Sequence, residues 1–266
     1  MKKIISQTAE IYGRTIKNRI LFQPMEGCDG TSDGAIDELT ARRYLRFVEG
    51  APGIIWFEAT AVCNEGRANP RQLFINENTL DSFKSLVKAI KSKSAELHGF
   101  EPVIIVQLTH SGRYSKPNGT PEPIVAYRNS LWEKGKEEQP FTVATDEYLS
   151  TIPALYEKAA KLALEAGFDG MDVKCCHGYL FNELLSAYDR PGSYGGSLEN
   201  RTRLLREGIA GAMQVTGSEF IVSSRLNVYD GFPYPYGFGV MQDGSLTPNL
   251  DEPIKLVKIL HKEHGF

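Results

Sequence analysis

The sequence predicts an α/β fold, namely a (β/α)8 TIM barrel of which this chain supplies about the first five βα units. Short β-rich runs alternate with longer segments of helical period, which is typical of parallel βα units. The runs are almost continuously apolar, as expected of strands buried on both faces. No GxGxxG follows the first run, which argues against an open dinucleotide-binding sheet.

The expected strands are five apolar runs, each followed by polar residues. They span residues 19–25, 53–62, 103–108, 170–174 and 220–226. Five units in 266 residues give about 53 residues per unit, so a complete barrel needs roughly 400 residues. We therefore expect one domain, residues 1–266, that is incomplete at its C-terminal end.

Helices are predicted where apolar residues recur every three or four positions. One such stripe begins at Leu80 and reaches Ile90. Another follows the acidic start Thr145-Asp146-Glu147 and ends before Gly167. Two more are expected at about 200–215 and 252–263, each ending near a glycine. Residues 115–140, which are rich in proline, glycine and charge, form a long excursion from the third strand.

Composition excludes several classes of protein. Thirty Lys and Arg against 33 Asp and Glu give a net charge of −3, so we expect no nucleic-acid partner. No apolar window approaches a membrane span and residues 1–6 carry no signal core, so we expect no membrane partner and a cytoplasmic location. Cys28, Cys63 and Cys176 follow strand ends, but no pair has ligand spacing, so no metal site is predicted.

In such a barrel the C-terminal ends of the strands line the active face. Lys174 and His177, three residues apart after the fourth strand, could donate hydrogen bonds to one ligand oxygen, and the phenol of Tyr179 could deliver a proton. In the alternative, Lys174 reaches solvent and His177 satisfies a backbone carbonyl. The polar groups at the other strand ends favour the first interpretation.

Gln107 and Arg225 lie within apolar strands, where a polar side chain is costly to bury without a partner. Gln107 could bond to a neighbouring strand, and Arg225 could form a buried ion pair. A flat, electron-accepting heterocycle with carbonyls and ring nitrogens would satisfy both residues, and an arginine beside it would stabilise the negative charge of reduction.

Several motifs together resemble the Old Yellow Enzyme family of FMN-dependent oxidoreductases. They are Gly167 to Gly170, the HGYL string at 177–180, and Tyr194-Gly195-Gly196-Ser197-Leu198-Glu199-Asn200-Arg201. Residues 107–113 (QLTHSGR) resemble the family's third-strand motif, and residues 17–25 its first strand. The resemblance covers almost the whole chain in the right order.

The resemblance implies a barrel that holds FMN at its C-terminal mouth and uses NADH or NADPH as the electron donor. It implies that the isoalloxazine ring is bordered by Pro24, Met25, Glu26, Ala59, Gln107 and Arg225. Lys174 and His177 would hold the carbonyl oxygen of a small conjugated substrate, and Tyr179 would protonate that substrate while hydride leaves flavin N5. The implied activity is that of an NAD(P)H-dependent ene-reductase.

Two residues depart from the family pattern. Lys174 stands where members usually have histidine, so a full charge would face the ligand and favour an anionic or strongly polarised acceptor unless burial lowers the lysine's pKa. Glu26 stands where members commonly have threonine or cysteine. A carboxylate there would disfavour reduced, anionic flavin unless it is protonated or paired with Lys174, and the sequence leaves both alternatives open.

The third departure is length, because the strands whose loops grip the FMN phosphate are expected to be absent. Unpaired sheet edges would then favour association, so a homo-oligomer is among the expected states. Two other functions stay open: an aldolase-like barrel with Lys174 as the Schiff-base lysine, and a non-catalytic incomplete barrel. The aromatic residues of 229–238 would either stack on a planar substrate or pack the loop.

Overall fold

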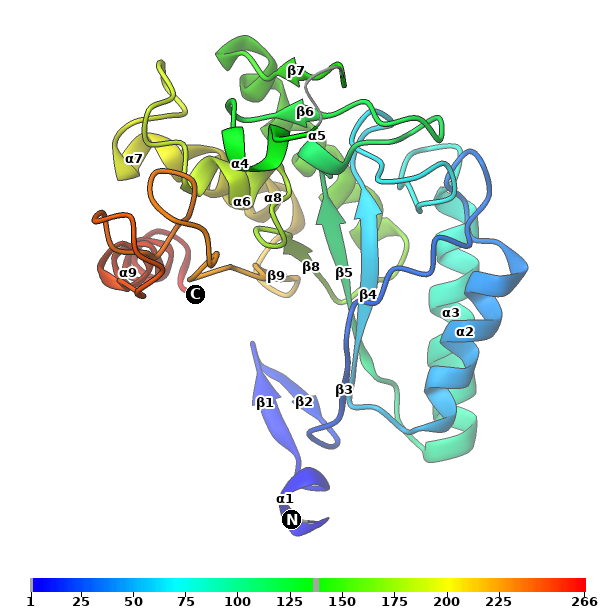
Figure 1. Ribbon diagram of the computed structural model, residues 1–266. Helices are drawn as coiled ribbons and strands as arrows, with labels where there is room; N and C mark the ends of the chain where they lie inside the picture. Colours follow the sequence, from blue (N-terminus) through cyan, green and yellow to red (C-terminus); the bar gives the residue numbers. More distant parts are fainter. Residues whose placement is uncertain (1, 136–138) are drawn as a thin grey trace.

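A parallel five-stranded sheet runs through the molecule in the computed structural model, which describes residues 2–135 and 139–266 (Figure 1). Its strands are β3 (Leu21–Phe22), β4 (Ile54–Ala61), β5 (Val103–Thr109), β8 (Gly170–Val173) and β9 (Ile221–Ser223). They lie side by side in chain order, β3-β4-β5-β8-β9. This order has no reversal, which distinguishes an arc of a βα barrel from a doubly wound sheet. All five predicted strands are confirmed, although the first is short.

A long helix follows each strand along the chain; the first four lie on the outer face of the sheet, and the last packs against the fourth. These are α2 (Glu38–Glu49), α3 (Leu80–His98), α5 (Asp146–Glu165), α8 (Arg203–Thr216) and α9 (Asp251–His264). The Thr145 side chain accepts from the Tyr148 amide and begins α5, and Gly99 ends α3 in the left-handed conformation. The expected helix at about 200–215 is in fact two, because α7 (Leu198–Arg201) ends at Thr202 before α8 begins.

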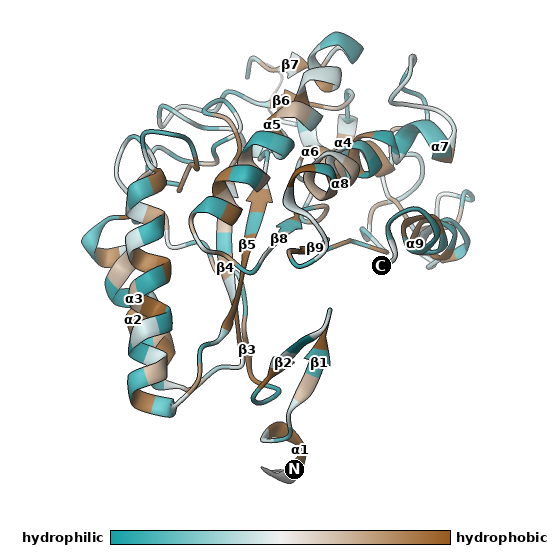
Figure 2. Ribbon diagram, turned by 180° about the vertical axis from the view of Figure 1, so that it is seen from behind, coloured by the Kyte–Doolittle hydropathy of each residue, from teal (hydrophilic) through white to brown (hydrophobic). Residues whose placement is uncertain are grey.

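The two faces of the sheet differ in what covers them. Ile55 and Phe57 of β4 point outward, where the Phe57 ring stacks on Tyr44 of α2 with centroids 4.0 Å apart. Figure 2 shows the strands as largely apolar, whereas the helices alternate between apolar and polar residues. The outward residues and the apolar helix faces form the main core.

An N-terminal hairpin covers the inner face of the sheet near the N-terminal ends of the strands, and the sequence did not predict it. It is formed by β1 (Ala9–Ile11) and β2 (Arg14–Ile16), follows the short helix α1 (Lys2–Ile5), and lies below the sheet in Figure 1. Ile16 of the hairpin packs with Ile54 and Ile105 in a second buried cluster. Functional groups are therefore left to the opposite, C-terminal end.

The predicted excursion after the third strand carries short elements of its own. They are a 3-10 turn η1 (Gly112–Tyr114), β6 (Ile124–Val125), α4 (Ser130–Glu133) and β7 (Thr142–Val143), with β6 and β7 paired in parallel. Residues 136–138 of this excursion lie outside the described residues. After β8 the chain forms the short helix α6 (Leu180–Leu185), which lies beneath the excursion. Within the described residues, no helix is both long and apolar enough to cross a membrane.

Candidate active site

Three of the predicted site residues meet at the C-terminal end of the sheet. Lys174 directly follows β8, and its side chain is only 3% exposed. Its Nζ lies 2.9 Å from Oε1 of Glu26, which follows β3, and 3.8 Å from the ring centroid of Tyr179. The Tyr179 hydroxyl donates to the same Glu26 oxygen at 3.3 Å. Of the two alternatives for Glu26, the structure therefore has the pairing with Lys174.

The environment of Tyr179 keeps its phenol protonated. Burial raises the pKa of Tyr179 well above its ordinary value, and the negative charge of Glu26 raises it further. The Lys174 ammonium lies over the face of the aromatic ring, which is a favourable cation–π position. A protonated phenol in this position can act as an acid at neutral pH.

His177 occupies a sharp turn between β8 and α6. Its φ is 64° and that of Gly178 is 68°, so both residues adopt the left-handed conformation. Burial lowers the pKa of His177, and the positive charges of Lys174 and Arg225 lower it further. The imidazole is therefore neutral at pH 7 and can donate one hydrogen bond and accept another.

Gln107 of β5 faces Asp172 of β8, a residue for which the sequence predicts no role. The two residues are direct partners in the sheet register, and the Gln107 Nε2 donates to Asp172 Oδ2 at 2.5 Å. Trp56 Nε1 donates to the same oxygen at 2.9 Å, and the Arg225 backbone amide donates to Oδ1 at 2.6 Å. Asp172 is fully buried. A carboxylate between Met171 and Val173 is the sequence signal that could have revealed it, by the same argument that singled out Gln107.

The remaining predicted residues lie at neighbouring strand ends. Ala59 is fully buried within β4, and its carbonyl accepts from the Gln72 side chain. Pro24 is buried after β3, and the next residue, Met25, is 69% exposed. The half-buried Arg225 follows β9, and its guanidinium has no hydrogen-bond or ion-pair partner within residues 2–135 and 139–266.

The unpartnered polar atoms allow a test of whether a flavin fits this site. The Gln107 Oε1 and the Thr109 Oγ1 are buried on β5, and neither has a partner among the residues that the structure describes. With the Arg225 guanidinium, they offer an acceptor, a hydroxyl and a cation. A flavin ring carries carbonyls and one ring N–H on its pyrimidine edge, so these residues fit FMN.

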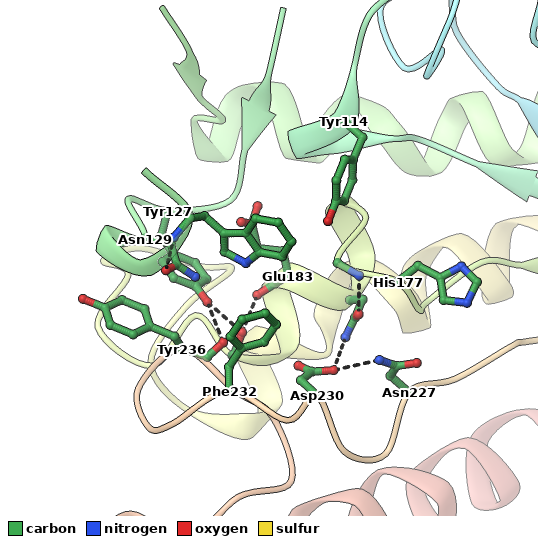
Figure 3. Close-up of a pocket in the computed structure, with 13 residues that line it drawn as sticks. Tyr114, Tyr127, Asn129, His177, Glu183, Asn227, Asp230, Phe232 and Tyr236 are labelled. Atoms are coloured by element: carbon green, nitrogen blue, oxygen red, sulfur yellow. Dashed lines mark hydrogen bonds between the residues drawn. The ribbon is translucent and has the colours of Figure 1, made fainter. Parts of the chain in front are cut away.

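A cavity of about 240 Å³ adjoins the His177 turn (Figure 3). Three aromatic rings line it, those of Tyr114 in η1, Trp132 in α4 and Phe232. The centroid of the Trp132 ring lies 5.7 Å from that of Tyr114 and 5.4 Å from that of Phe232. The Tyr114 ring also lies 5.5 Å from that of Tyr179. A row of aromatic rings in contact with one another therefore connects Tyr179 with the cavity.

The aromatic residues of the loop at 229–238 divide between the cavity and the packing of the loop, and stacking on a planar substrate stays a prediction. Phe232 and Tyr236 line the cavity. Tyr234 instead packs on Tyr188 with ring centroids 4.9 Å apart, and Phe238 is fully buried. The loop is held by Asp230, which accepts from the Asn182 side chain and, as Figure 3 shows, from the Asn227 side chain.

The cysteines form no cluster. All four are free thiols; Cys28 is exposed and the other three are buried. Across the described part of the chain, no group of three His, Cys, Asp or Glu side chains could hold a metal ion.

Comparison with known proteins agrees with this geometry. An arc of βα units with polar groups gathered at its C-terminal end matches part of the (β/α)8 barrel of the flavin oxidoreductases. The profile of the NADH:flavin oxidoreductase / NADH oxidase family matches residues 9–241, and the chain belongs to that family. FMN is the cofactor of this family, and NADPH or NADH is its electron donor.

Individual relatives support the same assignment. The chain is 35% identical to an NADPH dehydrogenase of Geobacillus sp. (strain WCH70), over 88% of this chain and 66% of that protein. It is 26% identical to the Old Yellow Enzyme of Pichia sp. AKU4542, with a TM-score of 0.78 over 97% of this chain and 66% of that one. A 2-naphthoyl-CoA reductase, at 22% identity and a TM-score of 0.82, shares the fold over 99% of this chain and 39% of its own. The chain thus spans just under two thirds of the first two proteins.

Proposed function

We propose that residues 1–266 form an FMN-binding barrel domain of an NAD(P)H-dependent oxidoreductase that reduces the activated C=C bond of a small conjugated carbonyl compound. The observation that carries this proposal is the convergence of Glu26, Lys174 and Tyr179 beside the unpartnered groups of Gln107 and Arg225. FMN, when bound, supplies the hydride that it has received from NADPH or NADH.

The chain's own residues bind the substrate and move the proton. Lys174 keeps N–H donors beyond the one that Glu26 accepts, so it and His177 can both donate to the carbonyl oxygen of the substrate. Negative charge that develops on this oxygen during hydride addition is stabilised by the ammonium. The Tyr179 Oη gives its proton to the substrate carbon next to the carbonyl, so hydride and proton together saturate the C=C bond.

The ion pair between Lys174 and Glu26 disfavours the Schiff-base alternative. Schiff-base formation needs the free amine of Lys174, whereas an ammonium paired with the Glu26 carboxylate is not a nucleophile. The site also holds a neutral phenol within reach of that pair, which suits proton donation better than imine chemistry.

Tyr179→Phe tests the proposal. In the FMN-loaded protein we expect reduction of 2-cyclohexenone to slow by about 100-fold or more, because the proton donor is lost. Flavin reduction by NADPH, followed by stopped-flow absorbance, should be nearly unchanged, because this half-reaction needs no proton from the phenol.

Tyr229→Phe is the matched control, because the Tyr229 hydroxyl donates to the Leu246 carbonyl on an outer loop. It should change neither rate. Equal slowing of both half-reactions in Tyr179→Phe would contradict the assigned proton donor, and a protein that neither binds FMN nor oxidises NADPH or NADH would contradict the proposed function itself.

A further inference from the structure

We propose that Asp172 is a positioning residue, which fixes the side-chain amide of Gln107 so that the amide oxygen faces the flavin ring and the amide nitrogen faces away from it. The inference rests on the proposed function, because it concerns the flavin that the site would hold. It assigns a role to a buried acid whose hydrogen bonds go to Gln107, Trp56 and the Arg225 backbone amide.

The carboxylate of Asp172 accepts three hydrogen bonds. Oδ2 accepts from Gln107 Nε2 and Trp56 Nε1, and Oδ1 accepts from the Arg225 backbone amide. Gln107 and Asp172 are direct partners in the register of β5 and β8, and both are fully buried. Burial raises the pKa of Asp172, and the three N–H donors oppose that rise because they stabilise the charged form. An ionised carboxylate only accepts hydrogen bonds, so it bonds to the NH2 end of the Gln107 amide and not to its oxygen.

The orientation of the amide follows from this contact. With its nitrogen held by Asp172, Gln107 directs Oε1 to the opposite side, where this buried atom has no partner in the described part of the chain. A ligand that places an N–H there satisfies the oxygen, whereas a ligand that places a carbonyl or a methyl group there leaves it unsatisfied. In a flavin ring, the group that matches is the ring N–H at N3.

Asparagine cannot replace Asp172 in this role. Three donors converge on two oxygens, so the side-chain amide in Asp172→Asn must turn its NH2 toward at least one of them. If Oδ1 stays on the fixed Arg225 backbone amide, the new NH2 faces Gln107, and the Gln107 amide turns its oxygen toward it. The flavin edge would then meet the NH2 end of Gln107.

The first experiment tests the hydrogen bond between Gln107 and Asp172 in the absence of flavin. In the 15N-labelled chain, the side-chain amide resonance of Gln107 is assigned by its loss in Gln107→Met. We expect its hydrogens to exchange slowly with solvent in the wild type and at least ten-fold faster in Asp172→Asn. Asp169→Asn is the control, because Asp169 precedes the same strand and binds Arg14 and Lys91 instead. Equal exchange in the wild type and Asp172→Asn would overturn the inference.

The second experiment uses flavin binding. FMN and FMN methylated at N3 are titrated into the chain, with binding followed by flavin fluorescence. The wild type and Asp169→Asn should bind FMN at least about ten-fold more tightly than the methylated form, because methylation leaves a buried acceptor unpaired. In Asp172→Asn the two affinities should agree within about three-fold, and adding this substitution to Gln107→Met should have no further effect.

The outcomes separate the inference from the proposed function. An undiminished preference for FMN in Asp172→Asn contradicts the positioning role even though flavin binds. No binding of FMN to the wild type contradicts the proposed function, and the inference about flavin falls with it. If Asp172→Asn does not fold, the 13C chemical shift of the Asp172 carboxylate is compared between the wild type and Gln107→Met. A changed chemical shift supports the contact between the two residues, and an unchanged one overturns the inference.

Discussion

At the scale of single residues, two departures from the family pattern compensate each other. Lys174 alone would place a charge in a nearly fully buried position, and Glu26 alone would place a carboxylate where the proposed function puts the reduced flavin. Together they form an ion pair 2.9 Å long against the ring of Tyr179. The pair keeps the donors of Lys174 and removes most of its net charge, so the preference for anionic acceptors expected from a lone lysine is reduced.

Glu26→Gln tests this coupling. Because the carboxylate raises the pKa of Tyr179, its replacement should lower the pKa of that phenol. The substitution should also lower the free energy of unfolding by about 1–3 kcal/mol, since the Lys174 ammonium loses its charged partner. NMR of 13Cζ-labelled tyrosine, assigned with Tyr179→Phe, measures the first effect, and urea unfolding measures the second. A Tyr179 pKa that rises or stays constant would show that Glu26 does not act on the phenol.

His110 gives the fold a pH dependence of its own. Burial lowers the pKa of His110 to about 4 from an ordinary value of 6.5. Its Nε2 faces the Tyr148 hydroxyl at 2.8 Å, and its Nδ1 accepts from the Gly112 amide. As the pH falls below 6.5, His110 therefore becomes protonated in the unfolded chain, whereas in the folded chain it stays neutral until about pH 4.

We accordingly expect His110 to contribute stability that is present above pH 6.5 and is lost as the pH falls to about 4, with a total of roughly 3 kcal/mol. In His110→Gln this part of the pH dependence should be absent. Urea unfolding at a series of pH values from about 7 to about 4 gives the difference between the two proteins. Parallel curves for wild type and variant would contradict the assignment.

At the scale of elements, helix α2 is tied to strand β4 by a buried carboxylate. Glu58 is 1% exposed and accepts from Arg43 Nη2 at 2.6 Å, and the Tyr44 hydroxyl also bonds to it. Burial raises the pKa of Glu58, and the Arg43 charge opposes that rise. Arg43 also binds Asp29, so it joins the helix, the strand end and the segment that carries Glu26.

Arg43→Met should therefore lower the free energy of unfolding by about 3–5 kcal/mol, because Glu58 is left buried without its charged partner. Arg71→Met is the matched control, since Arg71 pairs with Asp37 at the start of α2 in a largely exposed position. That change should cost less than about 1 kcal/mol. Thermal or urea unfolding compares the two variants, and equal losses would argue that the buried pair does not hold the helix to the sheet.

The elements also show what the sequence can and cannot predict. The strands were predictable because burial on both faces makes them continuous apolar runs, as in residues 103–108. Helix α2 was not predicted. The hairpin at 9–16 was not predicted either, because strands of three residues are too short to show a periodic pattern. At the site, residue types predicted Gln107 and Lys174. The Gln107–Asp172 contact depends on the register of two strands separated by a long excursion, which no local pattern determines.

At the scale of the whole molecule, the described residues leave apolar surface exposed at one side of the sheet. A groove of about 290 Å³ is lined by Val228, Leu250, Pro253, Ile254, Val257 and Lys258. Ile254 and Val257 are about half exposed on the outer side of α9, whereas Leu256 and Leu260 are buried on its inner side. The strands β3 and β9 are the two edges of the five-stranded sheet. Exposed apolar grooves and open edges both favour association.

We therefore expect the purified chain to self-associate through the α9 groove in a concentration-dependent way. Val257→Glu should weaken this association by placing a charge in the apolar contact, where it would lose its hydration. Leu97→Glu is the control, because Leu97 is a similarly exposed apolar residue on α3, far from α9 in Figure 1. Sedimentation velocity over a wide range of protein concentration measures the effect. A single monomer boundary for the wild type at every concentration, or equal weakening by both substitutions, would show that the groove is not the contact.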